Sequence, residues 1–154
     1  MTSPQTQAEH NKALVRRYYA DVANAAVPDT AIAGAEQLLT NDFTFYPLND
    51  AEGQPGLDAH KGFLVWHHGV SPDSRWTIEA ILAEGDQVAV RFTLRGTQQG
   101  ELLGVAPTGK PFTLRGMDLF RIADNKIREL RRFFDLLALL EQLGARPLPG
   151  QGED

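Results

Sequence analysis

The sequence predicts an α+β fold in which helices pack against one face of a curved, mainly antiparallel sheet. Helical patterns fill the chain up to Gly69, and strand-like segments separated by short turns follow. Helices grouped before a run of strands are typical of this class. The 154 residues, 42% of them hydrophobic, fit one domain with a sizeable core. We therefore expect one domain over 1–154, with an ordered core over about 8–145.

Three helices are predicted in the first part of the chain. Apolar residues recur at helical spacing over 8–24, and this pattern stops before Pro28. A cap signal at Asp29 predicts a second helix over about 30–39. Asp58 is the expected N-cap of a third helix, which ends at Gly69.

Five later or intervening segments have the alternation and the residue types of strands. They are 42–47, 76–82, 87–95, 110–122 and 127–134. Asp135 is expected to cap a short last helix that ends at Gly144, a residue suited to a left-handed C-cap. The tail over 146–154 is expected to be loose.

The composition argues against several classes of function. A formal net charge of -5 disfavours binding to nucleic acid or to anionic lipid, because both require a basic surface. The absence of cysteine excludes disulfides, thiolate catalysis and cysteine-based zinc sites. The N-terminal residues lack a signal-peptide pattern, and no apolar stretch is long enough to span a bilayer. These observations predict a cytoplasmic protein that binds neither nucleic acid nor membrane.

Several phrases in the sequence carry a family resemblance. They are GVAPTGK, DLFRIADNKI and LEQLG, and NDFTFYP upstream fits the same pattern. Over about residues 10–145, the chain resembles the SnoaL-like polyketide cyclases. The resemblance implies a cone-shaped α+β barrel of the nuclear-transport-factor-2 type, which is commonly a homodimer. It also implies chemistry on an apolar, oxygenated small molecule: aldol ring closure in these cyclases, or epoxide opening in the related limonene epoxide hydrolases.

The binding site that the resemblance implies is a pocket enclosed by the helices at 8–24 and 58–68. In aldol cyclases of the family, an aspartate on the last long strand works with a histidine on the strand before it. The aligned positions in this chain are Arg132 and Asp118, and Gln98 stands where many members carry a further histidine. The fold transfers from the family, whereas the catalytic pair does not.

The loop between the last two strands decides which residues face Asp118 and Arg132. A two-residue loop would set Arg121 against Arg128, and like charges directly opposite each other are destabilising. A three-residue loop improves every pair along the hairpin. The pairs that it creates are Ala123–Ile127, Arg121–Glu129, Phe120–Leu130 and Asp118–Arg132. The sequence therefore predicts a three-residue loop and a direct contact between Asp118 and Arg132.

This pair has two interpretations. If it points inward among phenylalanine and leucine side chains, it is desolvated and the two charges must satisfy each other. The functional interpretation makes Asp118 a base or hydrogen-bond acceptor, and makes Arg132 the group that stabilises an anion such as an enolate. The structural interpretation is a buried ion pair that replaces the family's catalytic pair. The residues alone leave both interpretations open.

Other candidates combine an apolar body with a polar tip, or share the inward face of the hairpin. The expected substrate-binding residues are Tyr18, Tyr46, Trp66, Gln98, Phe120, Leu130 and Phe134. His60 and His67 lie on one face of the third helix and are candidate acid–base groups near neutral pH. Core packing is the alternative for the aromatic residues, and a surface location is the alternative for the histidines. No histidine spacing suits a metal, so no metal site is expected.

Together these patterns predict a cofactor-independent cyclase or isomerase of a polyketide-like biosynthetic pathway. It would close a ring or open an epoxide by acid–base chemistry in an enclosed apolar pocket. The alternative is a non-catalytic ligand-binding or dimerisation module on the same fold.

Overall fold

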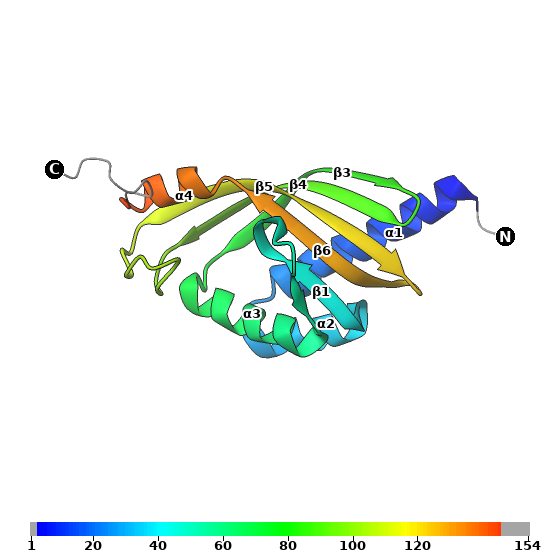
Figure 1. Cartoon of the computed structure of the whole chain (residues 1–154), viewed down its shortest axis with the longest axis horizontal. Helices are drawn as coiled ribbons and strands as arrows, with labels where there is room; N and C mark the ends of the chain where they lie inside the picture. The colour runs from blue at the N-terminus through cyan, green and yellow to red at the C-terminus, as the bar shows by residue number, and fades with distance from the viewer. Residues whose placement is uncertain (1–2, 146–154) are drawn as a thin grey trace.

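The computed structural model describes residues 3–145 and confirms the predicted α+β class. Within those residues, four α-helices pack on a six-stranded sheet with the strand order β2-β1-β6-β5-β4-β3 (Figure 1). The sheet is strongly curved but stays open, because β2 and β3 form its two edges and do not pair. The predicted tail over 146–154 lies outside the described residues.

The predicted helices and strands occur in the predicted order along the chain. The helices are α1 (Pro4–Tyr18), continued by a π-helical turn (Tyr19–Ala23), α2 (Pro28–Leu38), α3 (Leu57–Val70) and α4 (Leu136–Gln142). The strands are β1 (Leu39–Tyr46), β2 (Gln54–Pro55), β3 (Arg75–Glu84), β4 (Gln87–Thr97), β5 (Pro111–Ala123) and β6 (Lys126–Phe134).

The helix ends differ from the predictions at the N-termini. Ser3 caps α1, which therefore begins earlier than expected: its Oγ accepts a hydrogen bond from the backbone of Thr6 at 3.1 Å. Asp58 is not the N-cap of α3, since Gly56 holds that position and Asp58 is exposed in the first turn. At the other end of the chain, Asp135 caps α4 as predicted, by accepting from the backbone of Ala138.

One pair of strands makes the sheet mixed. β1 runs parallel to β6, whereas every other ladder is antiparallel. The chain reaches β1 directly from α2, so the strand begins at Leu39 and not at Asp42 as the alternation suggested. The short strand β2, in a segment for which no strand was predicted, pairs with β1.

The sheet has an inner face covered by helices and an outer face that the described elements leave largely open (Figure 1). Along β4 and β5, buried and more exposed residues alternate, as expected of a sheet that packs on one side. The inner face and the helices α1, α2 and α3 form one apolar core. This alternation decides which side chains can reach a site on the inner face.

The β5–β6 hairpin contains three of the four predicted pairs but not the predicted loop. The predicted Ala123–Ile127 pair is wrong, because Ala123 lies opposite Lys126 and Ile127 lies opposite Ile122. Its turn has two residues, Asp124 and Asn125, with φ angles of 53° and 61°, as two-residue hairpin turns require. A bulge at Arg128 then adds one residue to β6. Beyond the bulge, Arg121 faces Glu129 and the pairs continue in the predicted register to Asp118 opposite Arg132. The extra residue thus lies in the strand and not in the loop.

Candidate functional site

A cavity of about 450 Å³ lies between α3, the inner face of the sheet, the loop after β4, and α4. Most of its wall is apolar. The lining residues are Phe45, Pro47, Leu48, Gln54, Gly62, Phe63, Trp66, His67, Val70, Ser71, Trp76, Leu94, Leu102, Leu103, Phe112, Leu114, Arg132, Phe134 and Leu139. The expectation that the helix at 8–24 encloses the pocket is wrong, because no lining residue comes from α1. That helix instead fills the other end of the inner face, where its residues join the core.

Arg132 and Asp118 form a buried, two-point ion pair at the inner end of this cavity. The Nε of Arg132 donates to Oδ1 of Asp118 at 2.8 Å, and its Nη2 donates to Oδ2 at 2.9 Å. Tyr19 donates its hydroxyl proton to the same Oδ2. Both carboxylate oxygens are therefore engaged, and the Asp118 side chain has no exposed surface.

Electrostatics and packing fix Arg132 as a cation. Burial alone would lower the pKa of its guanidinium, but the Asp118 carboxylate outweighs this effect and raises that pKa above its ordinary value. The guanidinium carbon lies 4.3 Å from the ring centre of Trp76, within the range of cation–π attraction. Burial, followed by the charge of Asp118, raises the pKa of Tyr19 well above 10, so its hydroxyl remains a donor.

The geometry gives the two partners different roles. Asp118 uses both oxygens inside the protein and does not line the cavity on the inner face. Arg132 does line it, and among the described residues its Nη1 has no hydrogen-bond partner. The arrangement makes Arg132 a donor to a bound anion and makes Asp118 the group that orients it.

His67 is the titratable cavity residue next to this pair. Burial, and secondarily the charge of Arg132, lower the pKa of its imidazole to about 4, so the ring is neutral at pH 7. Its Nε2 lies 3.1 Å from the Oγ of Ser74, and the described contacts give its Nδ1 no protein partner. The ring packs on Trp76, with 5.8 Å between ring centres. A neutral imidazole held in this way can accept a proton at Nδ1.

His60 takes a different position, behind the cavity. It is fully buried, and its Nε2 lies 2.8 Å from the hydroxyl oxygen of Tyr18. Phe43 and Phe63 pack on its ring. Burial, with a smaller contribution from Arg132, lowers its pKa to about 3. Tyr18 is therefore a core residue, as its alternative interpretation proposed, and does not line the cavity. His60 does not line the cavity either, and its alternative interpretation as a surface residue is also wrong, because it is buried in the core.

The two lowered histidine pKa values predict an acid-sensitive fold. In the unfolded chain both imidazoles titrate near 6.5, whereas in the folded protein they stay neutral down to about 4 for His67 and about 3 for His60. The unfolded state binds more protons below pH 6.5. The free energy of unfolding should therefore decrease as the pH is lowered, by up to about 1.4 kcal/mol per pH unit for each histidine. Urea unfolding of the wild type and of His67→Gln between pH 6.5 and 4 tests this. In the variant, the part of the slope of unfolding free energy against pH that the two histidines contribute should be about halved. An unchanged slope would contradict the lowered pKa of His67.

The other predicted residues separate into three groups. Trp66 and Phe134 line the cavity, whereas Phe120 and Leu130 are completely buried in the core beside it. Tyr46 lies on the opposite side of its strand from Phe45, where the guanidinium carbon of Arg131 stacks 3.8 Å from its ring centre.

Gln98 is a structural anchor and not a cavity residue. Its Nε2 donates to the carbonyls of Gly100, Val105 and Ala106, and its Oε1 accepts from the backbone and the hydroxyl of Thr108. The loop between β4 and β5 has no neighbouring strand, so the side chain of Gln98 satisfies these part-buried backbone groups. Gln98 therefore holds the loop that closes one side of the cavity.

Three important residues of the site were not predicted from the sequence. Tyr19 falls within the predicted helix at 8–24, but the π-helical turn that begins there directs its hydroxyl to Asp118. π-helical turns are frequent at functional sites, but no sequence signal marked this one. Trp76 and Phe45 could have been predicted as site residues, since the alternation of each predicted strand places them on its inward side.

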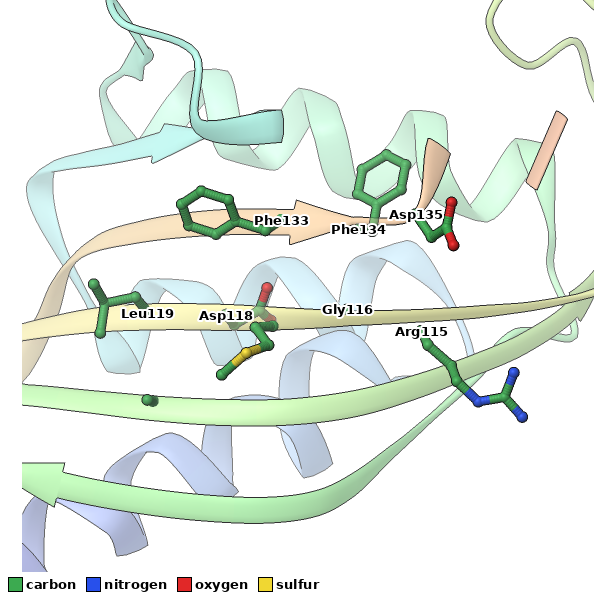
Figure 2. A pocket seen from close by; sticks show the side chains of 9 residues that line it. Arg115, Gly116, Asp118, Leu119, Phe133, Phe134 and Asp135 are labelled. Carbon is green, nitrogen blue, oxygen red and sulfur yellow. The ribbon is translucent and has the colours of Figure 1, made fainter. Parts of the chain in front are cut away.

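The outer face of the sheet also carries a depression of about 450 Å³, whose lining includes Asp118 and Phe134. Figure 2 shows it with the helices behind the strands, and with Phe133 and Leu119 on the open side. Met117 and Phe133 are about half exposed there, at 50% and 44%. We interpret this depression as part of an exposed apolar surface and not as the reaction site, because neither Arg132 nor His67 lines it and the Asp118 side chain has no exposed surface.

The part of the chain that the structure describes contains no group of three or more histidine, aspartate or glutamate side chains that could hold a metal ion. None of its helices combines the length and the apolar character needed to cross a membrane.

Comparisons with known proteins agree on the family and on the fold. The sequence profile of the SnoaL-like polyketide cyclases matches residues 13–143. The aklanonic acid methyl ester cyclase AcmA of Streptomyces galilaeus is 34% identical over 74 residues, which are 48% of this chain and 51% of that protein. The chain thus spans about half the length of the curated relatives that it matches.

Solved structures extend the similarity to the whole fold. A protein assigned to the SnoaL-like polyketide cyclases from Jannaschia sp. CCS1 superposes with a TM-score of 0.80 and 26% identity, over 91% of this chain and 95% of that one. AclR of Streptomyces galilaeus, described as a candidate hydroxylase, gives a TM-score of 0.74 and 26% identity, over 92% and 89%. Because the family profile covers most of the chain and the fold agrees, this chain belongs to the SnoaL-like polyketide cyclase family.

Proposed function

We propose that this protein is a cofactor-independent polyketide cyclase that closes a ring through an enolate bound in the cavity. The observation that carries the proposal is the unpartnered Nη1 of Arg132, a buried cation that lines an otherwise apolar cavity. An apolar, oxygenated substrate with one carbonyl directed at this donor would match the lining. The named activity of the relative AcmA supports the same class of reaction.

In the proposed reaction, His67 acts as the base and Arg132 stabilises the charge that develops. Nδ1 of His67 removes a proton from the carbon next to a substrate carbonyl, and the electron pair moves onto the carbonyl oxygen. Arg132 donates to that oxygen, which stabilises the enolate where its charge forms. The enolate carbon attacks a second carbonyl of the same molecule and forms the new C–C bond. The resulting alkoxide takes the proton back from the His67 imidazolium.

The low basicity of His67 explains why Arg132 is needed. A base whose pKa is about 4 removes a proton from carbon only when the enolate is strongly stabilised. Ser74 can accept from Nε2–H of His67, which would leave the Nδ1 lone pair available to accept the proton from the substrate. Both catalytic tasks are supplied by side chains, so the proposal requires no cofactor. Epoxide opening is less well supported, because the carboxylate that would activate water, Asp118, already uses both oxygens.

Aklanonic acid methyl ester is the first substrate to test, because it is named for a relative. The purified protein should accelerate its ring closure, followed by absorbance and by chromatography, since the product is an isomer of equal mass. Tight binding of the ester without acceleration would favour the alternative of a non-catalytic ligand-binding module.

We also propose that the outer face of the sheet pairs with a second copy of the chain. Three exposed apolar side chains support this, namely Leu82 at 71%, Met117 at 50% and Phe133 at 44%. Charge complementarity favours a second copy as the occupant. Arg75 lies opposite Arg95 at one end of the β3–β4 ladder, whereas the exposed Glu84 lies at its other end. In a twofold dimer, the arginine end of this ladder in one copy can lie against the glutamate end of the ladder in the other copy.

Light scattering at micromolar concentration tests the dimer. The wild type should have the mass of a dimer, and Met117→Glu should shift it to a monomer because it places a charge in the apolar centre of the interface. Val65→Glu is the matched control, since Val65 is equally exposed at 50% but lies on α3. A monomeric wild type would contradict this proposal.

A further inference from the structure

The mouth of the cavity is bordered by large apolar side chains that are exposed. Leu48, Trp66 and Leu103 all line the cavity, and their exposed fractions are 43%, 46% and 53%. Leu48 and Leu103 have φ angles of 50° and 53°. This left-handed region is uncommon for a bulky residue and costs conformational energy. The surrounding structure therefore holds both leucines at the mouth in backbone conformations that are unfavourable for a leucine on its own.

The loop that carries Leu103 is fixed before any ligand arrives. The five hydrogen bonds of Gln98 tie its two ends together. Within it, Leu102 and Val105 exchange two backbone hydrogen bonds, at 3.0 and 2.8 Å. Leu102 is turned into the cavity and is buried, whereas Leu103 is exposed at the rim. The apolar rim is thus a preorganised surface.

A second hollow continues from this rim along α3. It is a more open depression of about 540 Å³, and it shares Trp66, Val70 and Leu103 with the cavity. Its remaining border is formed by Gly69, Gly100 and Glu101. The two hollows are therefore continuous across Trp66, and a ligand that fills the first can extend into the second.

On the face of α3 beneath both hollows, one glycine lies on each side of Trp66. Gly62 and Gly69 lie four positions before and three positions after it, so the three residues share one helix face. A Cβ atom at either glycine would meet nothing within 4 Å apart from its chain neighbours and the nearby backbone of its own helix. In α2, by contrast, a Cβ at Gly34 would lie 2.9 Å from the carbonyl oxygen of Asp21. Packing accounts for Gly34, but no contact within the protein accounts for glycine at positions 62 and 69, although glycine weakens a helix.

We infer that the rim of Leu48, Trp66 and Leu103, together with the depression over Gly69, forms an outer subsite for a flat apolar part of the ligand. The inference rests on the proposed function, because the buried Arg132 donor orients the ligand from inside the cavity. The ligand's anionic end lies at Arg132, and its far end passes Trp66 and lies over the backbone of Gly69. The side-chain hydrogens at positions 62 and 69 leave room for a ring to approach the helix.

Two fluorescent carboxylate probes of different length test this subsite by titration. 2-Naphthoate offers only the end that Arg132 binds, whereas 6-phenyl-2-naphthoate adds one ring that can reach the depression. Gly69→Gln should weaken binding of the longer probe by about tenfold, the effect of losing one well-packed apolar contact, and should leave the shorter probe unchanged. Its melting temperature should not fall, since glutamine favours helix more than glycine does.

Val65→Gln is the matched control, because it changes helix propensity on the same helix at an exposed residue outside both hollows. It should bind both probes as the wild type does. The inference is overturned if both probes bind in an Arg132-dependent way and Gly69→Gln leaves the ratio of their affinities unchanged. If neither probe binds, or if Arg132→Lys binds them equally well, the anion site of the proposed function fails and the outer subsite fails with it.

Discussion

Replacing Arg132 by methionine should destabilise the protein by about 3–5 kcal/mol, the cost of leaving one partner of a buried ion pair alone. Methionine roughly keeps the length of the side chain and its packing on Trp76. It leaves the Asp118 carboxylate buried, with the Tyr19 hydroxyl as its remaining partner among the contacts described. Urea unfolding followed by circular dichroism measures the difference.

Arg131→Met is the matched control for this change. Arg131 is the neighbouring residue on the same strand, but it faces the other side of the sheet, and its ion pair with Glu129 at 3.0 Å is partly exposed. Exposed pairs contribute about 0–1 kcal/mol, so this variant should remain close to the wild type. The double variant Asp118→Asn with Arg132→Met should recover part of the loss, because it removes the stranded charge. Equal costs for the two single variants would contradict the burial argument.

Replacing His67 by glutamine should lower kcat by about 10²–10⁴-fold, the usual contribution of a general base. Glutamine can still hydrogen-bond to Ser74, so the wall of the cavity keeps its shape while the proton acceptor is lost. His68→Gln provides the control one residue further along α3. His68 does not line the cavity, because consecutive helix residues point about 100° apart. Steady-state kinetics measures kcat for both variants. If both have the kcat of the wild type, His67 is not the base.

The Asp118–Arg132 contact could be derived from sequence because charge pairing constrains a hairpin strongly. Only one register sets unlike charges and apolar residues opposite each other, and the protein has that register from the Arg121–Glu129 pair onward. The loop length was wrong for an instructive reason. A bulge in β6 shifts the pairing as much as one extra loop residue does, and pair preferences alone cannot distinguish the two.

The errors in the predicted site have local causes. Tyr46 was assigned to the pocket, although alternation from the buried Phe43 and Phe45 places it on the other side of β1. Gln98 was assigned from a family position, but it follows the end of β4, where the alternation of the strand no longer determines direction. Tyr19 required knowledge of a π-helical turn, and the walls of the cavity required the position of α3 relative to the sheet. Such features depend on long-range packing.

The central claim is that His67 and Arg132 form an enolate in the cavity, and proton exchange at carbon tests it most directly. Aklanonic acid methyl ester in D₂O should exchange the hydrogen next to its reacting carbonyl faster with the wild type than in buffer, even before the ring closes. His67→Gln and Arg132→Lys should both reduce this exchange to near the rate in buffer, while His68→Gln should not. Wild-type exchange no faster than in buffer, or undiminished exchange in His67→Gln, would contradict the account.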